Sequence, residues 1–241
     1  GSDLTERRKL LTGLRSRGFE SLDVARLTDA QLRERGLDPA KIDRQGTYFF
    51  KKITFNGKPA SVLIKYVDRD TAGHKDRFAS GFAQSDLVLY GGHARYGSGP
   101  DFDHKESTAG NFVIGANAAG HRNGTLTQSY DAHMREILKD SPNDLERAQL
   151  TNDYQLMFFS GCTTKHYLDE MRGIPRNKDQ KNLDFIGSDE VLYWNHIANN
   201  VLTVLDSVMV GESQNDISRR LFEINTVTFT ADGFGGNRYR P

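Results

Sequence analysis

The sequence predicts an α/β fold in which a mainly parallel β-sheet is covered by helices on both faces. Two short apolar runs, LVLY at residues 87–90 and LMFF at residues 156–159 within a strand predicted at 154–159, are each followed by small residues. Continuous apolar runs of this length are typical of strands that are buried on both faces. Helical patterns precede both runs, and this alternation favours parallel pairing with crossover helices.

Residues 1–46 are predicted to form a helical appendage, and residues 47–241 are predicted to form the main α/β domain. The first segment is rich in Arg and Asp and carries only narrow apolar stripes. Thr28 and Gln31 have the spacing of a capping box, in which each side chain bonds the backbone of the other residue. This pairing marks the start of a short helix.

Sequence patterns typical of β-strands begin after residue 46. Residues 48–55 and 60–67 are β-rich runs that flank Asn56 and Gly57, the pair most typical of a two-residue hairpin turn. A helix is predicted at residues 75–84, between this hairpin and the strand at 87–90. The order of strand, helix and strand predicts that 60–67 and 87–90 pair in parallel within one sheet.

Apolar periodicity also predicts the elements in the rest of the chain. Gly211 is expected to end a long apolar helix, and Ser213 is expected to cap the next one. The predicted strands are at 112–114, 183–187 and 227–230, and the predicted helices are at 129–139, 144–150, 166–172 and 189–210.

Composition excludes several classes of protein. Lys plus Arg and Asp plus Glu both number 32, so the chain offers no general charge for binding nucleic acid. A single cysteine cannot form an intrachain disulfide or a Cys-rich zinc site. No stretch approaches the roughly 20 apolar residues of a membrane span, and the start of the chain does not resemble a signal peptide. A cytoplasmic location is the default expectation.

His93 and Cys162 are the strongest candidate functional residues. Each directly follows a glycine at the end of an apolar run, as LVLYGGH at 87–93 and LMFFSGC at 156–162. Ligands bind beyond the carboxyl ends of parallel strands, and an imidazole can activate a thiol as a nucleophile. If the two strands are neighbours, the two side chains lie at one edge of the sheet. Each residue alone also has a structural interpretation, as a small core cysteine or a polar turn histidine.

The two motifs, with the strand and helix order from about residue 48 to 230, resemble the caspase-like cysteine peptidases. This superfamily includes caspases, metacaspases, legumains, gingipains and clostripains. The resemblance implies that Cys162 attacks a peptide carbonyl and that His93 transfers the protons. Backbone N–H groups of Cys162, which follows Gly161, and of Ala94, which follows His93, would bind the oxyanion. A protein or peptide would be the substrate, with no organic cofactor and no metal.

The sequence departs from the family pattern at two positions. Ala94 follows the histidine where many members have glycine, and Ser160 stands two residues before the cysteine, where members specific for basic residues often have Asp. Selectivity for the residue before the scissile bond would then come from another acid. The candidates for substrate contact are Asp68, Asp70 and Asp189, each of which could also be a cap or turn residue, together with Arg95.

Three alternatives remain open. The departures from the family pattern also fit an inactive caspase-like scaffold that binds partners. A metal-dependent hydrolase would use ligands around the loop after His93, and these are His93, Asp101, Asp103, His104 and His121, although their spacing matches no standard signature. The glycine-rich loop at 91–100 could bind phosphate, but it lacks the Gly-Lys-Ser/Thr ending of a P-loop.

Overall fold

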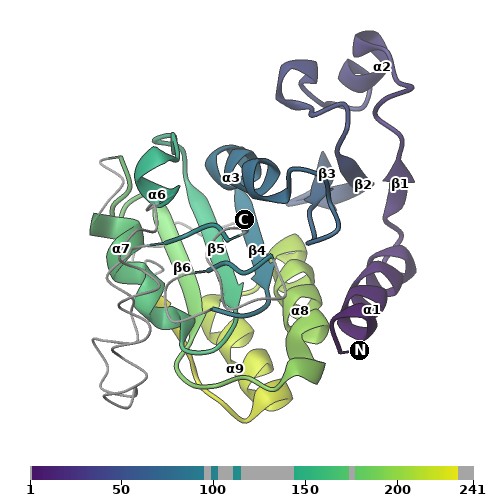
Figure 1. The fold of residues 1–241 in the computed structure, drawn as a ribbon. Helices are drawn as coiled ribbons and strands as arrows, with labels where there is room; N and C mark the ends of the chain where they lie inside the picture. Colours follow the sequence, from purple (N-terminus) through teal and green to yellow (C-terminus); the bar gives the residue numbers. More distant parts are fainter. Residues whose placement is uncertain (1, 95–98, 103–110, 115–143, 174–176, 233–241) are drawn as a thin grey trace.

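The computed structural model describes residues 2–94, 99–102, 111–114, 144–173 and 177–232, and these residues form an α/β protein with two β-sheets. One sheet has the strand order β1-β2-β3, and the other has the order β4-β5-β6-β7. Figure 1 shows the second sheet among α7, α8 and α9, with α1 and the first sheet to one side.

The four-stranded sheet is mostly parallel, as the apolar runs predicted. β4 (Leu87–Gly91), β5 (Gln155–Ser160) and β6 (Leu183–Ser188) pair in parallel, and β7 (Phe229–Asp232) is antiparallel to β6. Every residue of β5 and β6 is buried, which explains why these strands lack a polar face.

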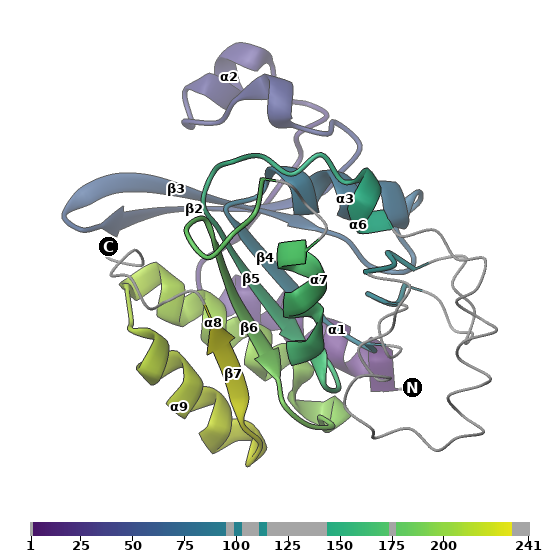
Figure 2. The same cartoon turned by 90° about the vertical axis from the view of Figure 1, so that its left-hand side faces the viewer.

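Helices cover both faces of this sheet. Met157 and Phe159 of β5 pack with residues of α3 (His74–Gln84) and α7 (Tyr167–Gly173). Leu156 and Phe158 point to the opposite face, because side chains alternate along a strand, and pack with residues of α8 (Ile197–Val210) and α9 (Gln214–Asn225). Figure 2 shows α7 on one side of the sheet and α8 and α9 on the other.

The predicted hairpin is confirmed. β2 (Thr47–Phe55) and β3 (Lys58–Tyr66) pair antiparallel along their whole length, and β1 (Glu20–Leu22) pairs with β2. Asn56 and Gly57 have φ angles of 51° and 74°, the left-handed conformation that a tight hairpin turn requires.

The predicted parallel pairing of 60–67 with 87–90 is wrong, because β3 and β4 belong to different sheets. β3 alternates between exposed and half-buried residues over its first half, which is typical of a sheet with one solvated face. Side chains of α1 (Ser2–Ser16), including Leu10 and Leu14, instead line the space between the two strands. β4 is therefore an edge strand within the part of the chain that the structure describes.

The N-terminal segment is closely joined to the rest of the fold. Leu14 of α1 and Phe19 share a buried cluster with Leu202 and Leu205 of α8. The capping box of Thr28 and Gln31 is confirmed at the start of α2 (Asp29–Arg33), and a 3₁₀ turn η1 follows at Pro39–Lys41. The segment also contributes β1, which the prediction of a purely helical appendage did not include.

Several predicted boundaries change. The helix predicted at 189–210 begins only at Ile197, after a 3₁₀ turn η4 (Trp194–His196), and Val191 and Tyr193 are exposed. Residues 112–114 are buried but form no strand, and the helical segment at 144–150 is limited to α6 (Asp144–Arg147). Gly211 and Ser213 cap α8 and α9 as predicted. The helix predicted at 129–139 lies outside the described residues.

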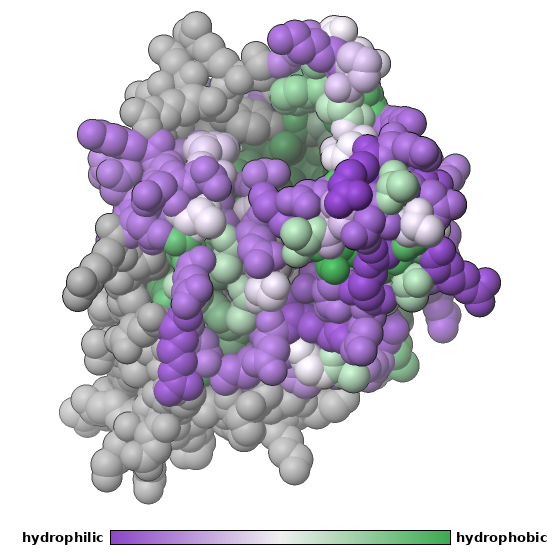
Figure 3. All heavy atoms as spheres, turned by 90° about the horizontal axis from the view of Figure 1, so that it is seen from above, coloured by the Kyte–Doolittle hydropathy of each residue, from purple (hydrophilic) through white to green (hydrophobic). Residues whose placement is uncertain are grey.

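Among the helices that the structure describes, none is long and apolar enough to cross a membrane. Among the coloured residues of the face seen from above, most are hydrophilic, and apolar side chains are visible in a hollow between them (Figure 3).

Candidate active site

The turns that carry His93 and Cys162 meet at the carboxyl edge of the parallel sheet. Gly91 of β4 lies opposite Ser160 of β5, so the two strands end at the same level. The Gly92 N–H donates to the Ser160 carbonyl at 3.0 Å and extends the pairing by one residue. The sequence-based expectation that these strands are neighbours is confirmed.

Gly161 allows the two turns to touch. A Cβ atom placed on Gly161 would lie 2.7 Å from the Gly92 carbonyl oxygen and 3.5 Å from the Ala94 nitrogen. Gly92 and Ala94 flank His93, and Gly161 precedes Cys162. The backbone around the histidine is therefore in contact with the backbone around the cysteine.

The turn at Cys162 is held from the neighbouring strand β6. The Ser188 hydroxyl donates to the Gly161 carbonyl, and the Thr163 N–H donates to the Glu190 carbonyl at 3.0 Å. Thr163 has a φ of 51°, a left-handed conformation that costs a β-branched residue roughly 1–3 kcal/mol. Cys162 itself is half-buried and leads into the 3₁₀ turn η3 (Thr164–His166) and then α7.

His93 is exposed and packs against Trp194. The two ring centroids are 4.8 Å apart, and the ring planes are inclined by 62°. Edge-to-face contacts of this kind restrict how an aromatic ring can turn. Trp194 falls within the helix predicted at 189–210, and nothing in the sequence analysis predicted its contact with the histidine.

Two tyrosines fix the backbone that carries His93. The Tyr90 hydroxyl donates to the His93 carbonyl at 2.7 Å and accepts the Asp101 N–H at 2.8 Å. The Tyr167 hydroxyl donates to the Ala94 carbonyl. Burial raises the pKa of Tyr167 well above its usual value, with smaller effects from Tyr90, Asp101 and Cys162, so this hydroxyl stays protonated and can donate.

Sequence reasoning also missed the tyrosines. Tyr90 is the one polar-tipped residue in an otherwise aliphatic strand, and a buried tyrosine normally has a partner for its hydroxyl. That signal could have identified Tyr90, whereas Tyr167 has no such local signal.

Replacing Tyr90 with phenylalanine is expected to lower the free energy of unfolding by about 1–3 kcal/mol, because the His93 carbonyl and the Asp101 N–H lose a partner. Amide hydrogen exchange should accelerate at Asp101. Tyr48→Phe is the matched control, since the Tyr48 hydroxyl accepts the Asp43 N–H at 3.0 Å in the other sheet. It should reduce stability without changing exchange at Asp101. Unchanged exchange in Tyr90→Phe would contradict the proposed anchoring.

The three candidate acids for substrate selectivity all lie beside basic groups. Asp68 is 2.9 Å from the Arg7 Nε atom, and Asp70 also accepts a bond from Arg7. Asp189 lies 3.5 Å from the Lys165 amino group. Asp68 lines a cavity that also reaches His93, whereas Asp70 is mostly exposed and Asp189 follows β6.

Ser160 is fully buried, and its hydroxyl accepts the Asn200 side-chain amide at 3.0 Å. The side chain two residues before the cysteine, where caspase-like peptidases specific for basic residues often have Asp, therefore points toward α8. Arg95 lies outside the described residues, as do Asp103, His104 and His121 of the alternative metal set. Among the residues that the structure describes, no cluster of His, Cys, Asp or Glu could hold a metal ion.

Comparison of the chain with protein-family models, with curated proteins and with solved structures gives no match. The class of site therefore rests on its own geometry. An accessible imidazole and a half-buried thiol follow adjacent parallel strands, and their two turns are in contact. This arrangement can support nucleophilic chemistry by a thiol with an imidazole as the proton carrier.

Proposed function

We propose that the protein is a cysteine peptidase of the caspase-like class, with His93 and Cys162 as its catalytic pair. The observation that supports it most is the contact between the two turns at the ends of β4 and β5. Both residues are also open to solvent, as a site that receives a macromolecular substrate requires.

The reaction would proceed through an acyl-enzyme. The Cys162 thiol gives its proton to His93, and the sulfur attacks the carbonyl carbon of the scissile bond. His93 donates this proton to the departing amine as the C–N bond breaks, and a thioester remains on Cys162. His93 then accepts a proton from water as the water oxygen attacks the thioester, and it returns this proton to the sulfur as the C–S bond breaks and the carboxylic acid product leaves. No oxidant, reductant or cofactor enters this sequence.

The backbone offers donors for the oxyanion. The Ala94 nitrogen, in the turn after His93, lies close to Gly161. The Cys162 nitrogen belongs to the neighbouring turn, directly after Gly161. In other hydrolases one such donor contributes roughly 2.7–4 kcal/mol to stabilising the transition state. Tyr167 holds the Ala94 carbonyl and thereby helps to orient this part of the backbone.

Alkylation by iodoacetamide tests whether the imidazole activates the thiol. We expect Cys162 to react at neutral pH at least ten times faster than a free thiol such as glutathione, and His93→Asn to remove most of this advantage. His74→Asn is the matched control, because His74 lies on α3 and stacks on Phe102. It should react like the unmodified protein. Mass spectrometry of the labelled peptide gives the rate.

The rate of alkylation also distinguishes a cysteine peptidase from an inactive caspase-like scaffold. A thiol that reacts no faster than glutathione, and that is indifferent to His93→Asn, would contradict a catalytic pair and favour an inactive binding protein. Hydrolysis of a mixed peptide pool should stop when Cys162 is alkylated.

A further inference from the structure

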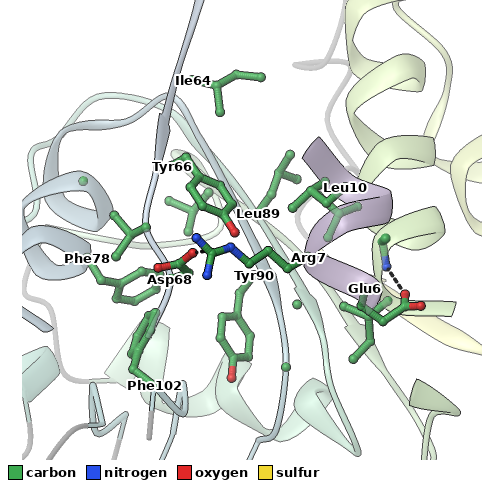
Figure 4. Close-up of a pocket in the computed structure, with 18 of the residues that line it drawn as sticks. Glu6, Arg7, Leu10, Ile64, Tyr66, Asp68, Phe78, Leu89, Tyr90 and Phe102 are labelled. Carbon is green, nitrogen blue, oxygen red and sulfur yellow. Dashed lines mark hydrogen bonds and ion pairs between the residues drawn. The ribbon is translucent and has the colours of Figure 1, made fainter. Parts of the chain in front are cut away.

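A largely apolar cavity of about 300 Å³ extends from His93 along the outer edge of β4. β3 and β4 belong to separate sheets, and the cavity lies between them and the helices that pack there. Its walls come from α1, β3, α3, β4 and the start of α8. They include Leu10, Ile64, Phe78 and Leu89, which are labelled in Figure 4. His93 and Trp194 also line the cavity.

The acids at the α1 side of the cavity already have partners. The Arg7 guanidinium points across the cavity to Asp68, at 2.9 Å (Figure 4). Glu6 accepts the Ala198 N–H at 3.0 Å and lies 2.7 Å from the Lys9 amino group. Burial, and then the nearby Asp68 carboxylate, raise the pKa of Tyr66, which keeps its phenol uncharged.

These pairings decide which chemistry the cavity can bind. A lysine or arginine side chain would have to displace Arg7 from Asp68. An acidic side chain would meet the same carboxylate, and the basic Lys65 and Arg77, which also line the cavity, are already paired with Asp43, at 3.7 Å and 2.6 Å. Transfer of an unpaired charge into apolar walls is strongly unfavourable. An uncharged apolar group gains from burial without disturbing either pair.

We propose that this cavity binds one large uncharged, apolar side chain of the substrate peptide, close to the scissile bond. The inference rests on the proposed peptidase function and specifies its substrate. The cavity is continuous with His93, and its volume is at the lower limit of ligand sites, which begin at about 300 Å³. That volume suits a single large side chain better than a folded segment.

Gly81 offers a way to fill the cavity from its wall. It lies on α3 and is half-buried, and a Cβ atom there would approach only the Lys65 Cδ atom, at 3.9 Å. Gly81→Leu can therefore place a branched side chain in the cavity without a backbone clash. Gly81→Ala adds only a methyl group and should fill less of the cavity. Gln84→Leu is the matched control, because Gln84 is exposed on the same helix.

The test compares peptides that differ at one position, carrying Leu, Phe, Ala, Lys or Asp, as substrates of the full chain. We expect the unmodified protein and Gln84→Leu to cleave the best Leu or Phe peptide at least ten times more efficiently than the Ala peptide. Gly81→Leu should reduce this ratio at least tenfold, and Gly81→Ala should reduce it less. The measured quantity is the ratio of kcat/KM values, which is insensitive to the amount of folded enzyme.

The outcomes distinguish the two proposals. Cleavage with a preference for Lys or Asp at every position tested, or a preference for Leu and Phe that Gly81→Leu leaves intact, would overturn the inference and leave the peptidase function standing. A protein that cleaves no peptide and whose Cys162 reacts like a free thiol would overturn both.

Discussion

Replacing Cys162 with alanine is expected to abolish peptide cleavage, with kcat lower by roughly 10⁴-fold or more. The thioester route requires the sulfur, and neither His93 nor the backbone donors can replace it as a nucleophile. Cys162 is half-buried at a turn whose backbone is held by Ser188 and Glu190, so the fold should persist. Cleavage of a peptide pool and thermal unfolding, measured on the same preparations, check both expectations.

Cys162→Ser is the matched variant, since it changes one atom and retains the shape of the side chain. It should be nearly as inactive as the alanine variant, because a hydroxyl beside this imidazole is a much weaker nucleophile. If Cys162→Ala cleaved peptides at the rate of the unmodified protein, the nucleophile would lie elsewhere and the proposed function would be wrong.

Replacing Gly161 with alanine is expected to lower kcat/KM by about 100-fold, although neither Cys162 nor His93 is itself replaced. The new Cβ atom would lie 2.7 Å from the Gly92 carbonyl oxygen, which is backbone and cannot rotate away. The two turns must therefore separate, and a displacement of about 1 Å can cost this much in rate. The strain should also lower the free energy of unfolding by about 1–3 kcal/mol.

Gly46→Ala is the matched control for this loss of stability. Its Cβ atom would lie 2.6 Å from the Tyr48 ring, next to the antiparallel sheet and away from the ends of β4 and β5. We expect a comparable decrease in unfolding free energy with little change in kcat/KM. Full activity and full stability in Gly161→Ala would show that the turns are not in contact in solution.

Local elements could be predicted from the sequence because their signals are local. The capping box at Thr28, the left-handed turn at Asn56 and Gly57, and the cap at Ser213 depend on residues within a few positions of one another. The apolar run of β5 predicted burial on both faces, which the two helical layers supply. The other run, β4, lies at the edge of the described sheet and is only partly buried.

The meeting of the turns that carry His93 and Cys162 could also be predicted, because each residue follows a glycine at the end of an apolar strand. Their partners could not. Trp194 reaches His93 from the turn before α8, and Tyr167 reaches Ala94 from α7, so each contact joins segments more than 70 residues apart. No periodicity or spacing encodes such a contact.

The sequence by itself determined most of the strands and helices, and it placed His93 and Cys162 directly after two apolar strands. Only the tertiary structure decided that β3 joins the antiparallel sheet and leaves the edge of β4 to a cavity. The physical reason is that strand propensity and capping depend on near neighbours along the chain. The partner of a strand depends instead on which other segments of the folded chain pack against its edge. Side chains of α1 lie between β3 and β4.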